Sequence, residues 1–148
     1  MRRLAAFIQL IRPINCVMMG VAVIAGASFV AFPSFSVNLV LAFVTSFALT
    51  AASMAINDYY DREIDAINEP QRPIPSHAVE PHESVILAFI LGVIGLATAL
   101  ATNMYCGITA ILALGVSIAY VTKGKQTGFL GNLLVSACVV TPFIYGGF

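Results

Sequence analysis

Charge is scarce in this sequence: only 9% of the 148 residues are charged, whereas 59% are hydrophobic and the mean hydropathy is +0.94. A soluble domain carries about 25% charged residues, so this chain cannot cover itself with a water-facing surface. Seven basic and seven acidic residues give a formal net charge of zero, which removes the electrostatic basis for binding nucleic acid. The sequence therefore predicts a membrane protein without a nucleic-acid partner.

Cysteine is also sparse, and its positions argue against a redox or zinc function. The three cysteines are Cys16, Cys106 and Cys138, and each lies inside an apolar stretch. An odd number of cysteines in apolar surroundings is typical of small core residues. We therefore expect neither a disulfide nor a cysteine-bound metal.

The sequence contains several long runs without a charged residue. A helix needs about 20 apolar residues to cross a hydrocarbon core of ~30 Å, and helices are expected because lipid leaves each segment to satisfy its own backbone hydrogen bonds. The fold class is therefore predicted to be all-α membrane, a multi-span transmembrane helical bundle in which 1–148 form one domain. The predicted spans lie near 13–32, 36–56, 84–103, 104–122 and 130–148.

The basic residues mark one side of the membrane. All seven lie in the N-terminal segment, in the loop after the second span and in the loop after the fourth span. By the positive-inside rule these segments are cytoplasmic. We expect a multi-pass protein of the cytoplasmic membrane, with its N-terminus and its acidic loop 57–83 in the cytoplasm. Residues 2–12 are expected to form a helix on the membrane surface, with Arg12 directed toward the lipid headgroups.

All seven acidic residues fall between Asp58 and Glu83, and several share one helix face. At about 100° per residue, four positions fall within an arc of about 100°: Asn57, Asp58, Asp61 and Asp65. Carboxylate and amide oxygens suit hard cations, and neighbouring carboxylates repel one another unless a cation lies between them. These four residues are our candidate Mg²⁺ ligands. The alternative is a solvated helix end whose acids face water.

The following loop supplies a candidate anion-binding residue. Arg72 lies among Pro70, Pro73 and Pro75, which stiffen the backbone, and its guanidinium suits phosphate oxygens. Mg²⁺ usually completes its coordination with water and substrate phosphates. An Asp-rich face beside apolar spans therefore favours a ligand with a diphosphate head and an apolar tail. Lys125 reaches the same side of the membrane. Alternatively, Arg72 is only a surface residue and Lys125 only a topology signal.

These motifs together resemble a known family. The pattern Asn57-Asp58-x-x-Asp61-x-x-x-Asp65, followed by Arg72-Pro73-Ile74-Pro75-Ser76, resembles the first signature of the UbiA superfamily of intramembrane prenyltransferases. Arg12-Pro13-x-Asn15 is similar to the N-terminal pattern of that family. Residues 127–132 and 142–147 most resemble its branch that makes archaeal ether lipids. His77 stands where the family usually has glycine after Pro-Ser.

The resemblance implies Mg²⁺-dependent transfer of a geranylgeranyl group from geranylgeranyl diphosphate to geranylgeranylglyceryl phosphate. The implied partners are a prenyl diphosphate, a lipid-phosphate or aromatic acceptor, and membrane lipids. Asp61 and Asp65 would be catalytic, by holding Mg²⁺ on the leaving diphosphate. The implied substrate-binding residues are Arg72, Lys125, Tyr120, Asn15 and Asn132. For the two asparagines, a hydrogen bond between helices worth ~1 kcal/mol is an equal alternative.

One family feature is missing from the sequence. UbiA-type members have about nine spans and a second Asp-rich motif, whereas here we predict five spans and no aspartate follows Asp65. We therefore expect an N-terminal fragment or a truncated product that is inactive alone, its missing partner being the C-terminal half of the same protein. The alternatives are another UbiA-type prenyltransferase for quinone, chlorophyll or haem side chains, a protein that binds prenyl diphosphate without turnover, and a purely structural fragment.

Overall fold

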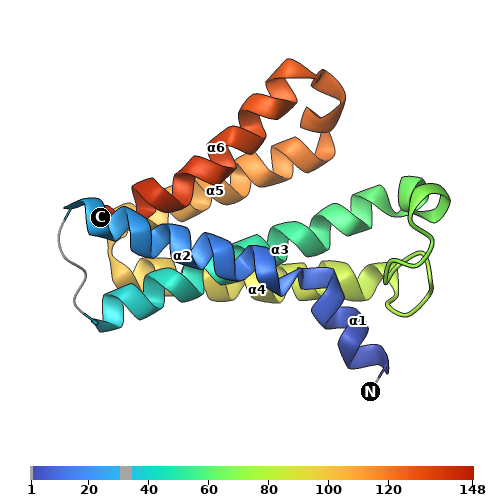
Figure 1. The fold of residues 1–148 in the computed structure, drawn as a ribbon, viewed down its shortest axis with the longest axis horizontal. Helices are drawn as coiled ribbons and strands as arrows, with labels where there is room; N and C mark the ends of the chain where they lie inside the picture. The colour runs from blue at the N-terminus through green and yellow to red at the C-terminus, as the bar shows by residue number, and fades with distance from the viewer. Residues whose placement is uncertain (1, 31–34) are drawn as a thin grey trace.

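The computed structural model describes residues 2–30 and 35–148, and within these ranges the secondary structure is entirely helical (Figure 1). The elements are α1 (Arg2–Ile11), α2 (Pro13–Val30), α3 (Val37–Asn68), α4 (Pro81–Thr102), α5 (Met104–Thr122), the 3₁₀ helix η1 (Gly124–Thr127) and α6 (Phe129–Tyr145). The predicted all-α bundle is confirmed. Residues 31 and 32, predicted to end the first span, lie outside the described ranges.

The apolar helices present most of their surface outward. The segment Arg3–Val30 and helices α3, α4 and α5 are long and apolar enough to cross a membrane, whereas α6 has only 17 residues. Only 22% to 33% of the residues in their most apolar stretches are buried inside the protein. Large side chains such as Phe29, Phe89 and Leu112 are exposed. Lipid is the solvent that suits this surface, so the chain is an integral membrane protein.

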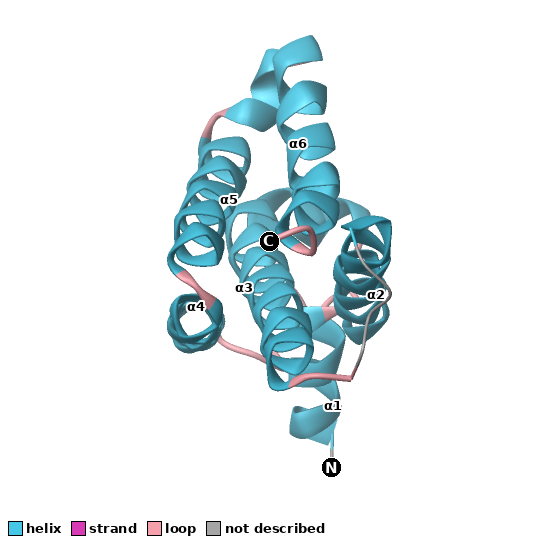
Figure 2. Cartoon of the chain, turned by 90° about the vertical axis from the view of Figure 1, so that its left-hand side faces the viewer, coloured by secondary structure: helices cyan, strands magenta, loops and turns pink. Residues whose placement is uncertain are grey.

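The helices form two pairs joined by α2. The α3–α4 pair is the most extensive contact of the bundle, α5 packs against α4 and α6, and α2 packs against α3 and α6. Figure 1 shows the two pairs meeting near the C-terminus and separating toward the opposite end of the bundle, and Figure 2 shows α2 and the pairs from that meeting end. A cavity lies between the pairs, lined by residues of α2, α3, α5 and α6.

Small residues allow the helices to approach closely. The buried face of α3 includes Ala48, Ala51 and Ala55, as expected where packing replaces the hydrophobic effect in lipid. Hydrogen bonds connect α3 to α4 across this interface: Ser84 Oγ donates to the Ala55 carbonyl at 2.7 Å, and the hydroxyls of Thr45 and Thr98 lie 2.8 Å apart. The α3–α4 pair therefore forms a firm base for the residues at the end of α3.

Two helix boundaries position the charged end of the bundle. Helix α3 has 32 residues and is therefore about 48 Å long, so it extends beyond a hydrocarbon core of ~30 Å and carries its acidic residues out of the lipid. Between α1 and α2, Arg12 adopts a left-handed backbone conformation with φ of 50°, and Pro13 begins α2, as proline commonly does. This break directs the Arg12 side chain toward α3.

Candidate functional site

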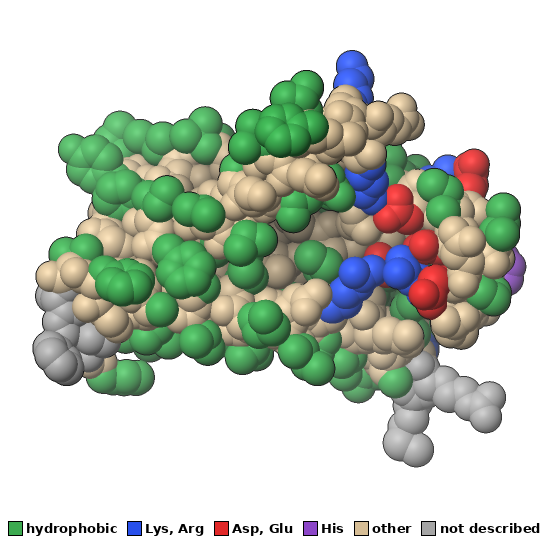
Figure 3. All heavy atoms as spheres, turned by 45° about the horizontal axis from the view of Figure 1, so that its top comes forward, with side chains coloured by type: hydrophobic (Ala, Val, Ile, Leu, Met, Phe, Trp, Pro, Cys, Tyr) green, Lys and Arg blue, Asp and Glu red, His purple; other side chains and the backbone are tan. Residues whose placement is uncertain are grey.

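Charged side chains from several segments gather at the end of the bundle where α3 ends. On the face drawn in Figure 3 they lie toward one end, while the rest of the face shows hydrophobic side chains among uncharged side chains and backbone. In three of the ion pairs the acids come from α3, and their basic partners come from the break between α1 and α2, the loop 69–80 and η1. These contacts divide the predicted Mg²⁺ ligands into two clusters.

Asp58, Asp65, Arg12 and Arg72 form the first group, here called the arginine cluster. Arg12 Nη2 donates to Asp58 Oδ1 at 2.7 Å, and Arg72 Nη1 donates to Asp65 Oδ2 at 2.7 Å while lying 3.8 Å from Asp58 Oδ1. The Asp58 and Asp65 side chains are only 5% and 9% exposed. Arg72 thus bridges two carboxylates that lie two helical turns apart, and Arg12 is paired with Asp58.

The loop holds Arg72 in place through its own backbone. The Arg72 amide donates to the Glu69 carbonyl at 2.9 Å, and its carbonyl accepts from the Ser76 amide at 3.0 Å. Ile74 is buried against the bundle. Burial alone would lower the pKa of Arg72, but its hydrogen bond to the Asp65 carboxylate and the other nearby carboxylates raise that pKa above its usual value. The guanidinium is therefore permanently charged.

Asn57, Asp61 and Lys125 form the second group, here called the lysine cluster. Lys125 Nζ lies 2.7 Å and 2.6 Å from the two carboxylate oxygens of Asp61, and Asn57 Nδ2 donates to Asp61 Oδ2 at 2.9 Å. The Asp61 and Lys125 side chains are 22% and 25% exposed. Lys125 Nζ also lies 5.9 Å from the centroid of the Tyr120 ring. This cluster rests on one lysine from a short turn and is open to solvent.

The donor set fits a hard cation. In the described part of the chain, no three histidine, cysteine or acidic side chains converge as they would in a preformed metal site. However, the Asn57 side-chain amide lies against the Asp61 carboxylate through its nitrogen, and a single ammonium group already lies against both oxygens of Asp61. Oxygen donors without sulfur or imidazole suit Mg²⁺. The lysine cluster is therefore a place on the acidic face where one cation already lies.

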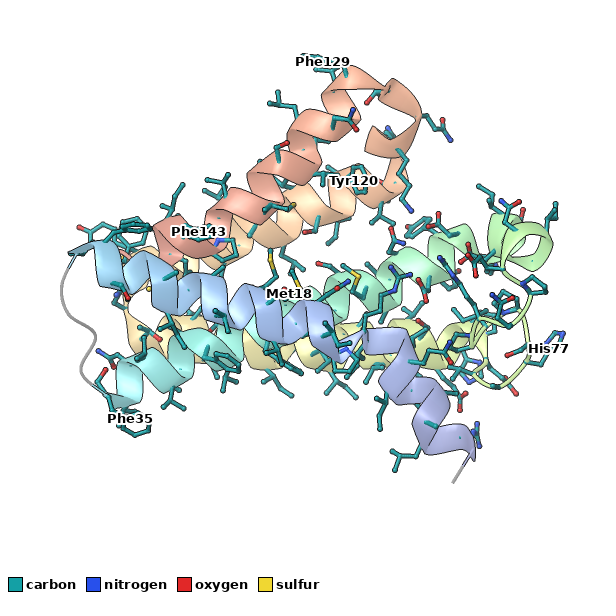
Figure 4. All side chains as sticks on the ribbon, in the orientation of Figure 1. Met18, Phe35, His77, Tyr120, Phe129 and Phe143 are labelled. Atoms are coloured by element: carbon teal, nitrogen blue, oxygen red, sulfur yellow. The ribbon has the colours of Figure 1, made fainter. Side chains whose placement is uncertain are left out.

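A cavity of about 430 Å³ opens beside these clusters. Residues of α2, α3, α5 and α6 line it. Arg12, Asn15, Asn57 and Tyr120 lie near the charged end, and its walls are mainly apolar, with Met18 on α2 among them. Figure 4 labels Met18 and Tyr120 on the two helices. Charge at one end and apolar walls beyond it suit an amphiphilic ligand.

The structure brings most of the predicted residues together. Asn15 and Tyr120 line the cavity, while Arg72 and Lys125 contact the acidic residues of α3. Asn132 is exposed at the start of α6 and is not among the residues that line the cavity.

Two residues needed the structure to be understood. The orientation expected for Arg12 was wrong, since the side chain binds Asp58 rather than pointing to headgroups; its place beside Pro13 and Asn15 was the available signal. His77 has φ of 58°, a left-handed conformation that glycine adopts without strain. Its side chain projects from the tip of the loop (Figure 4).

Comparisons with known sequences find a matching family model and several similar proteins. The model of the UbiA prenyltransferase family matches residues 16–148. The chain is 37% identical over 141 residues to digeranylgeranylglyceryl phosphate synthase of Methanopyrus kandleri, covering 95% of this chain and 52% of that protein. It is 38% identical over 146 residues to the same synthase of Methanospirillum hungatei, covering 97% and 51%. The chain spans about half the length of the curated relatives it matches.

Solved structures share the arrangement of helices. A structure described as giving structural and mechanistic insights into digeranylgeranylglyceryl phosphate synthase in membranes matches with a TM-score of 0.96 and 31% identity, over 99% of this chain and 53% of that one. A UbiA homolog from Archaeoglobus fulgidus, bound to DMAPP and Mg²⁺, matches with a TM-score of 0.84 at 20% identity, over 95% and 53%. At that identity the second match supports the fold alone.

Proposed function

Because the chain belongs to the UbiA prenyltransferase family, we propose that it carries the first diphosphate-binding motif of an enzyme that transfers a geranylgeranyl group from geranylgeranyl diphosphate to geranylgeranylglyceryl phosphate. The observation that carries this proposal is the lysine cluster at the charged mouth of an apolar cavity. The choice of substrates is supported by the names of its relatives in Methanopyrus and Methanospirillum. The product would be a membrane ether lipid.

The acidic residues of α3 would hold Mg²⁺ on the diphosphate. Asp61 and Asn57 are the most accessible donors, because their present partner is one partly exposed lysine. Asp65 and Asp58 would complete the acidic face. When bound, Mg²⁺ supplies neutralisation of the negative charge that builds up on the leaving diphosphate.

The basic residues would bind the phosphate oxygens directly. Lys125 Nζ is already beside Asp61, so it needs only a side-chain rotation to reach a diphosphate held there. Arg72 lies one turn further along the same face and presents a planar fork that suits two phosphate oxygens. Arg12 would keep Asp58 oriented and neutralised. Each cation lowers the cost of the charge that develops as the diphosphate departs.

The cavity would bind the prenyl chain and exclude water from its reactive end. The bond between the first prenyl carbon and the diphosphate oxygen breaks, and its electron pair leaves with the diphosphate. The acceptor hydroxyl oxygen bonds to that carbon and gives its proton to the released diphosphate. The Tyr120 ring, on the cavity wall, would stabilise positive charge on the allylic carbons. Asn15 lies on the same wall and would orient the head of the substrate.

The topology inferred from the charges is part of the proposal. The charged end of the bundle would face the cytoplasm, with α1 on the membrane surface and the five longer helices, near the spans predicted from the sequence, crossing the cytoplasmic membrane. Four of these segments have the required length and apolar character. Labelling of single cysteines placed at His77, beside the charged end, and at Phe35, at the other end, should react from opposite sides of the membrane.

Binding tests the proposal most directly. The chain is reconstituted in lipid nanodiscs and titrated with labelled geranylgeranyl diphosphate, with Mg²⁺ or with a chelator. We expect saturable binding that weakens at least ~10-fold without Mg²⁺, a loss of about 1.4 kcal/mol. The substrate proposal also predicts displacement by geranylgeranylglyceryl phosphate but not by an aromatic quinone precursor. Absence of Mg²⁺-dependent binding contradicts the proposal, and displacement by the aromatic compound redirects it to a different acceptor.

A further inference from the structure

A second cavity lies beyond the inner end of the first. It has a volume of about 280 Å³ and lies at the end of the bundle opposite the charged clusters, with Asn38, Asn103 and Phe148 among its lining residues. Among the residues that line the two cavities, Val23 and Tyr145 are the pair common to both. These two side chains, from α2 and α6, therefore separate the cavity we assign to the prenyl chain from the second cavity.

The partition formed by Val23 and Tyr145 is buried in the bundle. The exposed fractions of Val23 and Tyr145 are 0% and 5%, and both pack in one buried cluster with Cys106 and Ala110 of α5. A Cβ atom on Gly146 would clash with the carbonyl oxygen of Val23, so the backbones of α6 and α2 are in direct contact there. The Tyr145 ring lies one residue before this contact and is held in the same buried cluster.

The buried phenol hydroxyl of Tyr145 forms no hydrogen bond of ordinary geometry with the residues that the structure describes, although Thr45, Thr102 and Cys106 are its polar neighbours. A buried hydroxyl without a partner destabilises a fold. What the ring does provide is volume at the junction of two cavities. The bulk of the ring is therefore the property to test.

The distance from the charged end to the partition matches one prenyl length. From Asn57 to Thr45, both on the cavity wall, α3 advances about 18 Å at its helical rise. A fully extended chain advances about 3.6 Å for every three bonds, so the main chain of a geranylgeranyl group reaches on the order of 20 Å. A fifth isoprene unit would extend past this length into the Tyr145 ring.

We propose that Tyr145, supported by Val23, is the end wall of the prenyl cavity and limits the bound chain to four isoprene units. This inference rests on the proposed function, since it takes a prenyl diphosphate to be the ligand. It assigns Tyr145 a role in selecting substrate length, not in the chemistry at the charged end. Opening the wall should join the two cavities and admit a longer chain.

The test measures binding of prenyl diphosphates of three to six isoprene units to the chain in nanodiscs with Mg²⁺. For the unaltered chain, affinity should rise from three to four units and fall about tenfold or more at five, the expected cost of overfilling a packed wall. Tyr145→Ala should restore the affinity for five units to within about threefold of that for four. Tyr145→Phe should keep the original limit and unfold no more easily, because it removes only the unpartnered hydroxyl.

Two further variants make the test specific. Tyr105→Ala removes an exposed tyrosine at the same end of the bundle and should leave the length limit unchanged. Thr141→Phe places a ring on the cavity wall one helical turn, about 5.4 Å, nearer the charged end. It should shorten the preferred chain by one unit, and it tests the wall even if Tyr145→Ala fails to fold.

The outcomes separate this inference from the proposed function. Absence of binding at every length overturns both. Binding of five and six units as tightly as four means that the chain leaves the bundle sideways, which overturns the end wall and leaves the proposed function intact. An unchanged length limit in both Tyr145→Ala and Thr141→Phe, or a shifted limit in Tyr105→Ala, also overturns it.

Discussion

The arginine and lysine clusters bind neighbouring carboxylates of one helix face, but these carboxylates differ in their burial and in the number of their cationic partners. Asp58 is nearly inaccessible and lies close to arginines from two segments, whereas Asp61, three residues further, is partly exposed and is paired with one lysine. Removing one partner from a buried ion pair is costly, while a partly exposed pair contributes little. The comparison indicates that one short motif combines a buried ion pair with a partly exposed one, and the proposed function takes the second as the exchangeable ligand site.

The largest expected effect is loss of stability when the buried ion pair is broken. Arg12→Ala leaves the buried Asp58 carboxylate without its 2.7 Å partner, and we expect a loss of about 3 kcal/mol in the free energy of unfolding, the lower end for a buried pair because Arg72 stays 3.8 Å away. Reversible unfolding in mixed micelles measures it. Lys125→Ala is the matched control, because it removes the cation of the partly exposed pair, and should cost less than about 1 kcal/mol. Equal losses in the two variants would remove the distinction between the clusters.

For ligand binding, we expect the lysine cluster to matter more than the arginine cluster. Asp61→Ala removes the most accessible carboxylate of the acidic face, so Mg²⁺-dependent affinity for geranylgeranyl diphosphate should fall ~100-fold, or about 2.7 kcal/mol. Titration in nanodiscs measures it. Glu63→Ala serves as control, because the Glu63 side chain is 85% exposed and points away from the acidic face. A normal affinity in Asp61→Ala would rule out its role as a ligand.

Lys125 should act on two ligands in opposite directions. Lys125→Ala removes a phosphate contact, so affinity for the diphosphate should fall about tenfold. Affinity for Mg²⁺ alone should rise, because the ammonium no longer competes for Asp61. Calorimetric titrations with each ligand measure the two effects, and Lys123→Ala, at an exposed position, is the control. Parallel changes for both ligands would contradict the exchange of one cation for another.

The smallest effect concerns the loop that carries Arg72. Replacing His77 by glycine relieves a left-handed backbone conformation, which should stabilise the fold by up to about 1 kcal/mol after the greater freedom of glycine in the unfolded chain is deducted. The unfolding midpoint measures it. His82→Gly, in the first turn of α4, should instead destabilise. A lower midpoint for His77→Gly would mean that its side chain has a stabilising contact.

Much of the fold could be predicted because lipid imposes strict local rules. Uncharged runs of spanning length must be helical, and helix α5 occupies the very residues predicted for the fourth span. The acidic face of α3 was also predictable, since helical periodicity alone brings Asn57, Asp61 and Asp65 together. The turn η1 and the inward direction of the Arg12 side chain could not be predicted, because they depend on contacts between segments that are distant in sequence.

By itself, the sequence determined that the protein is a membrane-embedded helical bundle, which side its charges share and which residues form the acidic face, because hydropathy and helical periodicity are local properties. Only the tertiary structure divided that face into a buried arginine cluster and a partly exposed lysine cluster, since the partners of Asp58 and Asp61 come from other segments. It also decided where the cavity ends. That depends on the close contact of α2 and α6 at Gly146, which no local pattern encodes.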